Sequence, residues 1–149
     1  MVRRARPDES DAVAALHRLS REDAMPFLRG LHTEEEDRAF MRDRVFAEAE
    51  VWVAEFDGAL IGMCAFAPGR LDHLFVHPAY HGRGVGTALL QKAKDANRAL
   101  ELWVFQQNRV ASAFYERRGF VRVCETDGSG NEERQPDALY AWAAARVTE

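Results

Sequence analysis

Hydrophobic positions in the first part of the chain predict a short strand followed by a helix. Residues 2–6 are expected to form an edge strand, and Asp8 then offers an N-cap for the helix that follows it. The apolar positions of this helix recur at helical spacing at Val13, Leu16 and Leu19. Pro26 and Gly30 interrupt the pattern and mark the end of the helix.

A second helix is expected over residues 34–48. Thr33 and Glu36 stand three residues apart, the spacing at which two side chains cap each other's backbone amides. After this helix the hydrophobic pattern becomes that of strands, with Asp57-Gly58 and Pro68-Gly69 as tight turns. The sequence therefore predicts three antiparallel strands, over 51–56, 59–67 and 70–76.

The second half of the chain alternates helices with strands. One face of the first helix is apolar, at Val85, Leu89, Leu90 and Ala93, and the helix ends near Asn97. A buried strand over 99–105, a helix over 109–118 closed by Gly119, and strands over 120–126 and 138–144 follow it. A long polar loop, 127–137, joins the last two strands. The order β-α-α-β-β-β-α-β-α-β-β predicts an α/β (α+β) fold with a mixed, mostly antiparallel sheet and helices on both faces.

Composition and charge narrow the functional classes. The chain of 149 residues fits a single domain, 1–149, and its net charge of −4 argues against a nucleic acid partner, which usually requires a concentrated basic face. The basic N-terminus is followed by acidic residues rather than an apolar stretch, so no export signal is expected. No apolar run approaches the roughly 20 residues of a membrane helix, and the expected location is the cytoplasm.

The two cysteines are Cys64 and Cys124, and both lie in strand-like apolar runs without metal-ligand spacing. We expect them to be buried and reduced, with a disulfide as the alternative.

The segment "HGRGVG", residues 81–86, places a glycine-rich loop between a predicted strand and a helix. Such a loop presents unpaired amide groups at the positive end of the helix dipole, which is an anion site. Gly82 and Gly84 do not belong to a dinucleotide fingerprint, because Thr87 stands where that motif needs a third glycine, and no glycine-lysine pair completes a Walker loop. The alternative is a mobile loop without a ligand.

With these residues the sequence resembles the GNAT superfamily of N-acetyltransferases. The diphosphate signature of that family is Gln or Arg, two residues, Gly, any residue, then Gly or Ala. Gly84 and Gly86 match it, and His81 stands at the first position. "LFVHPAY" resembles the strand that carries the pantetheine arm of acetyl-CoA, and "NRVASAFYERRGF" resembles the second motif of the family. The resemblance covers nearly the whole chain and implies a sheet of roughly six to seven strands.

The resemblance implies an acetyl-CoA-dependent N-acetyltransferase that works by direct transfer, without a metal. The cofactor-binding residues it implies are Leu74, Phe75, Val76, His81, Gly82, Arg83, Gly84, Val85, Gly86, Thr87, Asn108 and Tyr115. Asn108 is alternatively only the cap of its helix. Neither cysteine lies in these motifs, so no acyl-enzyme is expected.

The chemistry needs a neutral amine, a donor for the developing oxyanion and a proton for the leaving thiolate. The resemblance assigns Asp72 to binding the amine, either as an anchor alone or also as the base that takes its proton through water. It assigns the Leu74 amide to the oxyanion and Tyr115 to the leaving thiolate. Along 70–76, strand alternation is expected to place Asp72 with Leu74 and Val76, and His73 with Phe75 on the other face. The plain alternative for Tyr115 is an amphipathic aromatic with its hydroxyl at the surface. His73 has an ordinary pKa better suited to a base but lies on the other face of the strand, and a structural histidine is its plain alternative.

The resemblance implies a primary amine as acceptor, on a small molecule, a peptide N-terminus or a lysine, and the residues do not identify which. Carboxylates near the acceptor side would favour a cationic acceptor, although solvated faces are the alternative; they are Glu34, Glu35, Glu36, Asp37, Glu132, Glu133 and Asp137. Tryptophans are expected to pack in the sheet, unless one bounds the acceptor pocket.

Two rival functions remain open at this stage. One is a non-catalytic acyl-CoA-binding module, and the other is an adaptor that binds partners through its acidic segments. Exposed strand edges favour a homodimer.

Overall fold

The computed structural model describes residues 1–28 and 31–145. It contains one seven-stranded sheet in the order β1-β2-β3-β4-β5-β7-β6. The strands are β1 (Val2–Arg4), β2 (Glu50–Phe56), β3 (Ala59–Ala67), β4 (Arg70–Val76), β5 (Ala99–Phe105), β6 (Val121–Thr126) and β7 (Asp137–Ala143). Every neighbouring pair is antiparallel except β4 and β5, which run parallel. The predicted mixed, mostly antiparallel sheet is confirmed.

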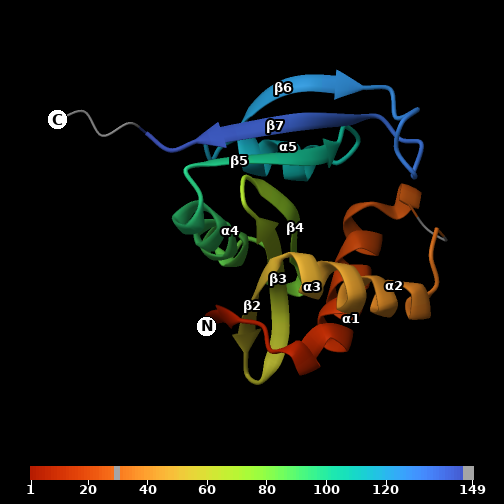
Figure 1. Cartoon of the computed structure of the whole chain (residues 1–149), viewed down its shortest axis with the longest axis vertical. Helices are drawn as coiled ribbons and strands as arrows, with labels where there is room; N and C mark the ends of the chain where they lie inside the picture. The colour runs from red at the N-terminus through yellow and green to blue at the C-terminus, as the bar shows by residue number, and fades with distance from the viewer. Residues whose placement is uncertain (29–30, 146–149) are drawn as a thin grey trace.

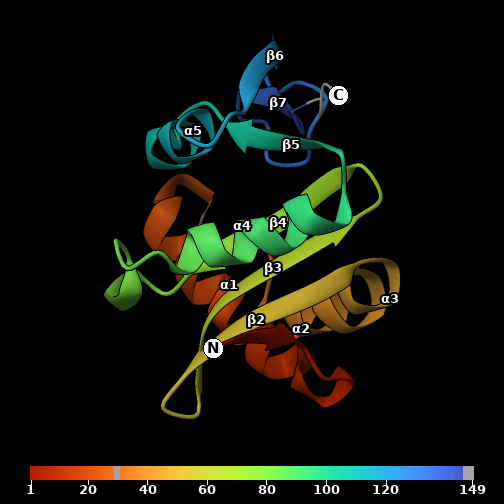
Figure 2. The same ribbon diagram turned by 90° about the vertical axis from the view of Figure 1, so that its left-hand side faces the viewer.

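Helices cover both faces of this sheet. They are α1 (Ser10–Ala24), α2 (Glu34–Phe40), α3 (Phe46–Glu48), α4 (Val85–Ala96) and α5 (Arg109–Glu116). A π-helical turn, Met41–Val45, joins α2 to α3, so the predicted second helix is helical along its length. Helices α1 to α3 lie on one side of β2–β4 and α4 on the other, whereas α5 lies against β5 and β7 (Figures 1 and 2).

The start of α1 differs from the prediction. Asp8 does not cap it, because Pro7–Glu9 forms a short 3₁₀ turn and the N-cap position belongs to Glu9. Leu19 is exposed on α1, whereas Val13 and Leu16 are buried. The buried face of the helix continues from Val13 through His17 and Ser20, four and seven positions later, and Leu19 lies outside it. Gly30, the predicted end signal, lies outside the described residues.

The N-terminus of α2 follows the sequence prediction closely. The Thr33 hydroxyl accepts a hydrogen bond from the Glu36 amide at 3.1 Å, and the Glu36 carboxylate accepts one from the Thr33 amide at 2.9 Å. Both partners of this capping box lie within four residues of each other, so local sequence suffices to specify it.

Two hydrophobic clusters lie on opposite sides of β2–β4. The first packs α1 and the π turn against β2 and β3, with Val13, Met41, Val53 and Met63 among its members. The second packs α4 and α5 against the sheet, with Leu89, Leu90, Leu100 and Tyr140 among its members. The sheet therefore holds the helices at fixed positions on both of its sides.

Two burial expectations are wrong in the C-terminal part of the sheet. Cys64 is buried in β3 as expected, but Cys124 is exposed on the edge strand β6, and both are free thiols. Strand β5 is buried only at alternate residues, and its Trp103 side chain is 55% exposed. Both differences arise because α5 covers one face of β5 and β7 (Figure 1).

Strands β4 and β5 separate soon after they meet. Their pairing consists of Arg70 opposite Glu101, and the Glu101 amide donates to the Gly69 carbonyl at 2.9 Å. Beyond this point the two strands diverge (Figure 1). The carboxyl end of β4 therefore faces an opening between the two parts of the sheet. Among the described residues, no helix is both long and apolar enough to cross a membrane.

Candidate active site

Two cavities meet at the opening between β4 and β5. The α2 cavity, of about 510 Å³, lies among α1, α2, β4 and β5. The loop cavity, of about 620 Å³, lies between the glycine-rich loop and α5. Five residues line both cavities: Leu74, Phe75, Asn108, Ala111 and Tyr115. Molecules bound in the two cavities would therefore meet at the end of β4 and the first two turns of α5.

The glycine-rich loop has the backbone geometry of an anion site. Gly82 and Gly84 have φ angles of +76° and +81°, in the left-handed region that favours glycine. The first hydrogen bond of α4 runs from the Ala88 amide to the Gly84 carbonyl at 3.0 Å. The amides of residues 85–87 precede that bond, so they have no acceptor within the helix and point out of its N-terminus into the loop cavity.

Gly86 is required by packing against α5. A Cβ atom added there would lie 3.2 Å from the Phe114 ring, closer than ordinary van der Waals contact. That ring is itself covered by the Arg118 guanidinium, whose carbon lies 3.8 Å from the ring centroid. Arg118 also donates two hydrogen bonds to the Thr87 hydroxyl, at 3.0 and 2.7 Å. This contact ties α4 to the residues just after α5, and no local sequence pattern indicates it.

Side chains around the loop differ in their positions. The His81 Nε2 lies 2.9 Å from the Val76 carbonyl oxygen, which fixes the loop to the end of β4. Arg83 stacks over the Tyr80 ring and does not line the loop cavity, unlike the other residues predicted to bind the cofactor. Ser20, from α1, lines this cavity with a buried hydroxyl that has no hydrogen-bond partner among the described residues.

The Leu74 amide faces the opening between the strands. The His77 amide donates to the Ile61 carbonyl of β3 at 2.8 Å, so alternate residues of β4 direct their amides towards β3. Leu74 lies three residues before His77, so its amide points to the opposite edge of β4 from β3. At this edge β5 has already diverged. Its side chain packs in the α4–α5 core cluster, as expected.

A β-bulge in β4 changes the predicted side-chain alternation at Asp72. Ala65 of β3 pairs with His73 of β4, but the next residue of β3, Phe66, pairs with Leu71. Strand β4 therefore has one extra residue, Asp72, at this point. Leu71, rather than Asp72, therefore shares the core face of Leu74, and the prediction for Asp72 is wrong in this respect. Asp72 lines the α2 cavity, and its carboxylate accepts hydrogen bonds from the Arg70 Nε at 2.9 and 3.1 Å.

Tyr115 is buried between Phe114 and Phe120 and is 8% exposed, so it is not an amphipathic aromatic at the surface of α5. Its hydroxyl has no hydrogen-bond partner within the described part of the chain. Burial raises the pKa of this phenol above its ordinary value of 10, because the charged phenolate is poorly solvated there. Asn108 accepts a hydrogen bond from the Ala111 amide at 3.2 Å and so caps α5, while also lining both cavities.

Two histidines face each other in the α2 cavity. The His17 Nε2 lies 3.3 Å from the His73 Nδ1, and the Phe75 ring packs edge-on against His17. His73 and Phe75 thus share a face, as predicted. Desolvation by burial lowers the pKa of both histidines, most strongly that of His17. His17 is not among the predicted site residues, although it lies one turn after Val13 on the buried face of α1.

Charged residues form the rim of the α2 cavity. Of the seven predicted carboxylates, Glu36, Asp37, Glu132 and Glu133 line it, whereas Glu34, Glu35 and Asp137 do not. Trp103 also lines it, so one tryptophan does bound this pocket.

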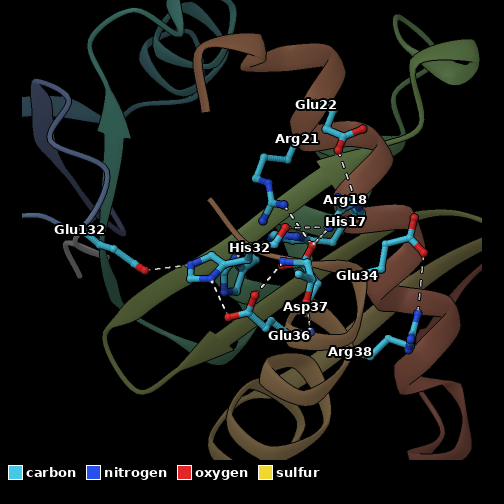
Figure 3. Close-up of polar contacts among 12 residues, drawn as sticks. His17, Arg18, Arg21, Glu22, His32, Glu34, Glu36, Asp37, Arg38 and Glu132 are labelled. Atoms are coloured by element: carbon cyan, nitrogen blue, oxygen red, sulfur yellow. Dashed lines mark hydrogen bonds and ion pairs between the residues drawn. The ribbon is translucent and has the colours of Figure 1, made fainter. Parts of the chain in front are cut away.

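Most of these rim carboxylates are paired (Figure 3). Asp37 accepts hydrogen bonds from Arg18 and Arg21 at 2.7 and 3.1 Å. The His32 Nε2 lies 2.8 Å from a Glu132 oxygen, and its Nδ1 lies 3.5 Å from a Glu36 oxygen. His32 therefore bridges the α2 side of the cavity to the loop between β6 and β7.

Comparisons with known proteins agree with this architecture. Residues 47–122 match the family model described as an acetyltransferase (GNAT) domain. The peptidyl-lysine N-acetyltransferase YiaC of Escherichia coli strain K12 is 33% identical over 149 residues, and the match covers 99% of each chain. The solution structure of apo YjaB from Escherichia coli has a TM-score of 0.79 and 26% identity, covering 97% of this chain and 98% of that one.

A coenzyme A complex is also among the similar structures. The PaiA N-acetyltransferase of Thermoplasma acidophilum, solved with coenzyme A, has a TM-score of 0.69 and 22% identity, and the match covers 96% of this chain and 98% of that one. At this identity the likeness concerns the fold.

Proposed function

Because this chain belongs to the GNAT superfamily of N-acetyltransferases, and is thus an acyltransferase, we propose that it transfers the acetyl group of acetyl-CoA directly to the side-chain amine of a peptide lysine. The observation that carries this proposal is the meeting of the two cavities at Leu74 and Tyr115. A donor thioester in the loop cavity and an amine in the α2 cavity would come together there. Neither the non-catalytic binding module nor the adaptor has support from the comparisons.

The loop cavity fits acetyl-CoA. The amides of residues 85–87 would bind the pyrophosphate, and the left-handed glycines leave that approach open to the phosphates. Ser20 places a hydroxyl without a partner in the same cavity, where a pantetheine amide would satisfy it. The Thermoplasma acidophilum relative with bound coenzyme A supports this assignment at the level of the fold. The proposed contacts also include His81, Val76 and Asn108, whereas Arg83 would act only through its charge.

Leu74 and Tyr115 are the proposed catalytic groups for the acyl carbon. The Leu74 amide would donate to the oxygen on which negative charge develops as the amine attacks. Tyr115 would stabilise the leaving thiolate by a hydrogen bond and give it a proton. Direct transfer is favoured because burial raises the pKa of the Cys64 thiol to about 12, which disfavours a thiolate nucleophile.

The α2 cavity fits a cationic side chain. Asp72 would anchor the incoming ammonium, and Glu133, which has no ion pair within the described residues, adds negative charge to the rim. Deprotonating a lysine of pKa about 10.4 at pH 7 costs roughly 4 to 5 kcal/mol, so the amine must lose its proton inside the site. The YiaC and YjaB relatives are named peptidyl-lysine N-acetyltransferases, which supports a lysine acceptor over a small amine.

At the level of the whole chain, we propose one domain over 1–149 that works in the cytoplasm as a homodimer. Edge strand β6 supports the dimer, since all its residues are exposed and Val121 and Val123 are 68% and 60% exposed. The free thiols of Cys64 and Cys124 are consistent with a reducing compartment.

The proposal is tested by incubating the protein with acetyl-CoA and a lysine-containing peptide with a blocked N-terminus, while following free thiol release. We expect turnover and a mass gain of one acetyl group on the lysine. The matched control is the same peptide with norleucine in place of lysine, which should not react. Thiol release that is equal with both peptides, or absent with every lysine peptide tried, would show that the acceptor assignment is wrong.

A further inference from the structure

The paired histidines of the α2 cavity have no role in the proposal above. His17 comes from α1 and is 8% exposed, and His73 comes from β4, 56 residues later in the chain. Phe75 packs edge-on against His17 with ring centroids 4.6 Å apart, and Phe40 contacts the His73 ring edge-on. Burying two imidazoles among aromatic rings is costly unless their nitrogens are hydrogen-bonded.

The contact between the rings limits their protonation. One nitrogen must donate and the other accept, so both rings can be neutral and still bonded. In one of the two possible arrangements, the His73 Nδ1–H donates to the His17 Nε2. The His73 Nε2 then carries a lone pair, and no described residue forms a hydrogen bond with it. Both histidines line the α2 cavity, so this lone pair is available to a molecule bound there.

The position of His73 in β4 places it beside the reacting atoms. It is adjacent in sequence to Leu74, whose amide faces the opening between the strands. Charged groups line the same cavity from each neighbouring element: Arg21 from α1, Glu36 and Asp37 from α2, Asp72 from β4, and Glu132 and Glu133 from the β6–β7 loop. Burial makes the largest contribution to the pKa of His73 and lowers it, which favours the neutral ring; Asp72 opposes this shift and Arg21 adds to it.

We propose that His73 accepts the proton of the attacking amine through its Nε2, and that His17 positions His73 by accepting its Nδ1–H. This proposal rests on the acetyltransferase function proposed above. His73 is a catalytic residue in this proposal, because it takes the proton, and His17 is a positioning residue, because it acts through His73.

The lysine ammonium first loses one proton to solvent, so that a neutral amine attacks, and from there the step balances in protons and electrons. The amine lone pair forms the N–C bond, the carbonyl π pair moves to oxygen, and the proton on nitrogen passes to the His73 Nε2. The oxygen pair then restores the carbonyl as the C–S bond breaks, and sulfur takes a proton from Tyr115. Solvent carries the proton from the His73 imidazolium back to the Tyr115 oxygen.

His17 contributes to this step by stabilising the positive charge that His73 gains with the proton. When His73 gains its proton, the Nδ1–H donated to His17 becomes a charge-assisted hydrogen bond, which is stronger than a neutral one. A neutral acceptor also leaves His73 with a low proton affinity at rest, so the Nε2 lone pair is free at neutral pH. A base of low pKa cannot remove a proton from a lysine ammonium, but it can take one from the far more acidic nitrogen formed by attack.

The first test compares His73→Gln with the wild-type enzyme on the lysine peptide. We expect kcat to fall by about 100-fold, the lower end of the effect of a general base, with little change in KM. The affinity for coenzyme A should stay within about twofold, because His73 does not line the loop cavity. Imidazole added to His73→Ala should restore part of the lost kcat.

The second test separates positioning from structural support. His17→Gln should lower kcat by about 10-fold in the wild-type background and have almost no effect in His73→Gln, because groups that act as a unit are non-additive. A purely structural role for His17 predicts equal losses in both backgrounds, and that result would contradict the proposal.

The third test needs no variant. Nitrogen-15 NMR of the wild-type protein should show an unprotonated Nε2 and a protonated Nδ1 on His73 at pH 7. A protonated Nε2 in the neutral ring, or full kcat in both His73→Gln and His73→Asn, would overturn the base assignment. If the wild-type enzyme itself fails to acetylate any lysine peptide, the failure lies in the proposed function, and the tautomer measurement still stands apart from it.

Discussion

Tyr115 shows how strongly a single residue depends on its surroundings. Two aromatic neighbours exclude water from the phenol ring, while its hydroxyl opens to both cavities. A hydroxyl without a partner contributes little to stability, so its removal should affect chemistry rather than folding.

We therefore expect Tyr115→Phe to lower kcat by about 10- to 100-fold, because a hydrogen bond to the leaving thiolate is worth roughly 2 kcal/mol in the transition state. The free energy of unfolding and the affinity for coenzyme A should change little. Steady-state kinetics with calorimetric titration of coenzyme A distinguish the two effects. An unchanged kcat, when chemistry limits turnover, would remove Tyr115 from the mechanism.

The raised pKa of Tyr115 gives this residue a definite pH behaviour. An acid must be protonated to act, and burial raises the pKa above the ordinary value of 10. The wild-type kcat should therefore not decline between about pH 8 and 10 through loss of this proton.

At the scale of elements, the N-terminus of α4 contains a glycine in the left-handed region and also forms part of the proposed ligand site. Gly84 adopts a φ of +81° as the N-cap of α4, and an added Cβ would meet no neighbour within 4 Å. The cost of a side chain there is therefore one of backbone conformation alone.

Gly84→Ala should destabilise the protein by about 1 kcal/mol, because alanine is strained in the left-handed region. It should also weaken coenzyme A binding, since relief of the strain turns the amides of residues 85–87 away from their common direction. Gly130→Ala is the matched control: Gly130 has open space around it and no positive φ, so neither property should change. Chemical denaturation and calorimetry measure both variants, and equal behaviour of the pair would contradict this account.

Strand β4 illustrates a limit of reasoning from one element. Its bounds follow from the hydrophobic pattern and the flanking turns, and the structure reproduces them at Arg70–Val76. The bulge at Asp72 does not follow from that pattern, because it is defined by the pairing with β3. The capping box of α2 shows the opposite case, since both of its partners are local.

At the scale of the whole molecule, each cavity draws its walls from both parts of the split sheet. The loop cavity combines α4, which packs on β2–β4, with α5, which packs near β5 and β7. Near the loop, Arg118, just after α5, bonds to Thr87 of α4, and the Phe114 ring of α5 packs on Gly86. A ligand in this cavity should therefore couple the two parts.

Coenzyme A should protect amides in both parts of the sheet. At a concentration of 100 times its Kd it should add about 2.7 kcal/mol to the free energy of unfolding. Hydrogen exchange should slow at residues 82–87 and also in the first turn of α5. Protection confined to one of these segments would mean that the ligand does not span the cavity.

The sequence by itself determined the order and bounds of nearly all the elements and the position of the glycine loop. Capping pairs, turn residues and periodicity act between residues a few positions apart, so they can be read along the chain. The resemblance carried by the loop and by residues 108–120 added the family, and it gave Leu74 and Tyr115 as candidates.

Only the tertiary structure decided which side chains meet. His17 and His73 are 56 residues apart and Arg118 and Thr87 are 31 apart, and no local pattern records such contacts. The exposure of Cys124 and Trp103 likewise depends on which face of the sheet α5 leaves uncovered. Pairing between distant segments depends on how whole elements pack, and the information for it is spread over the chain rather than held in any one segment.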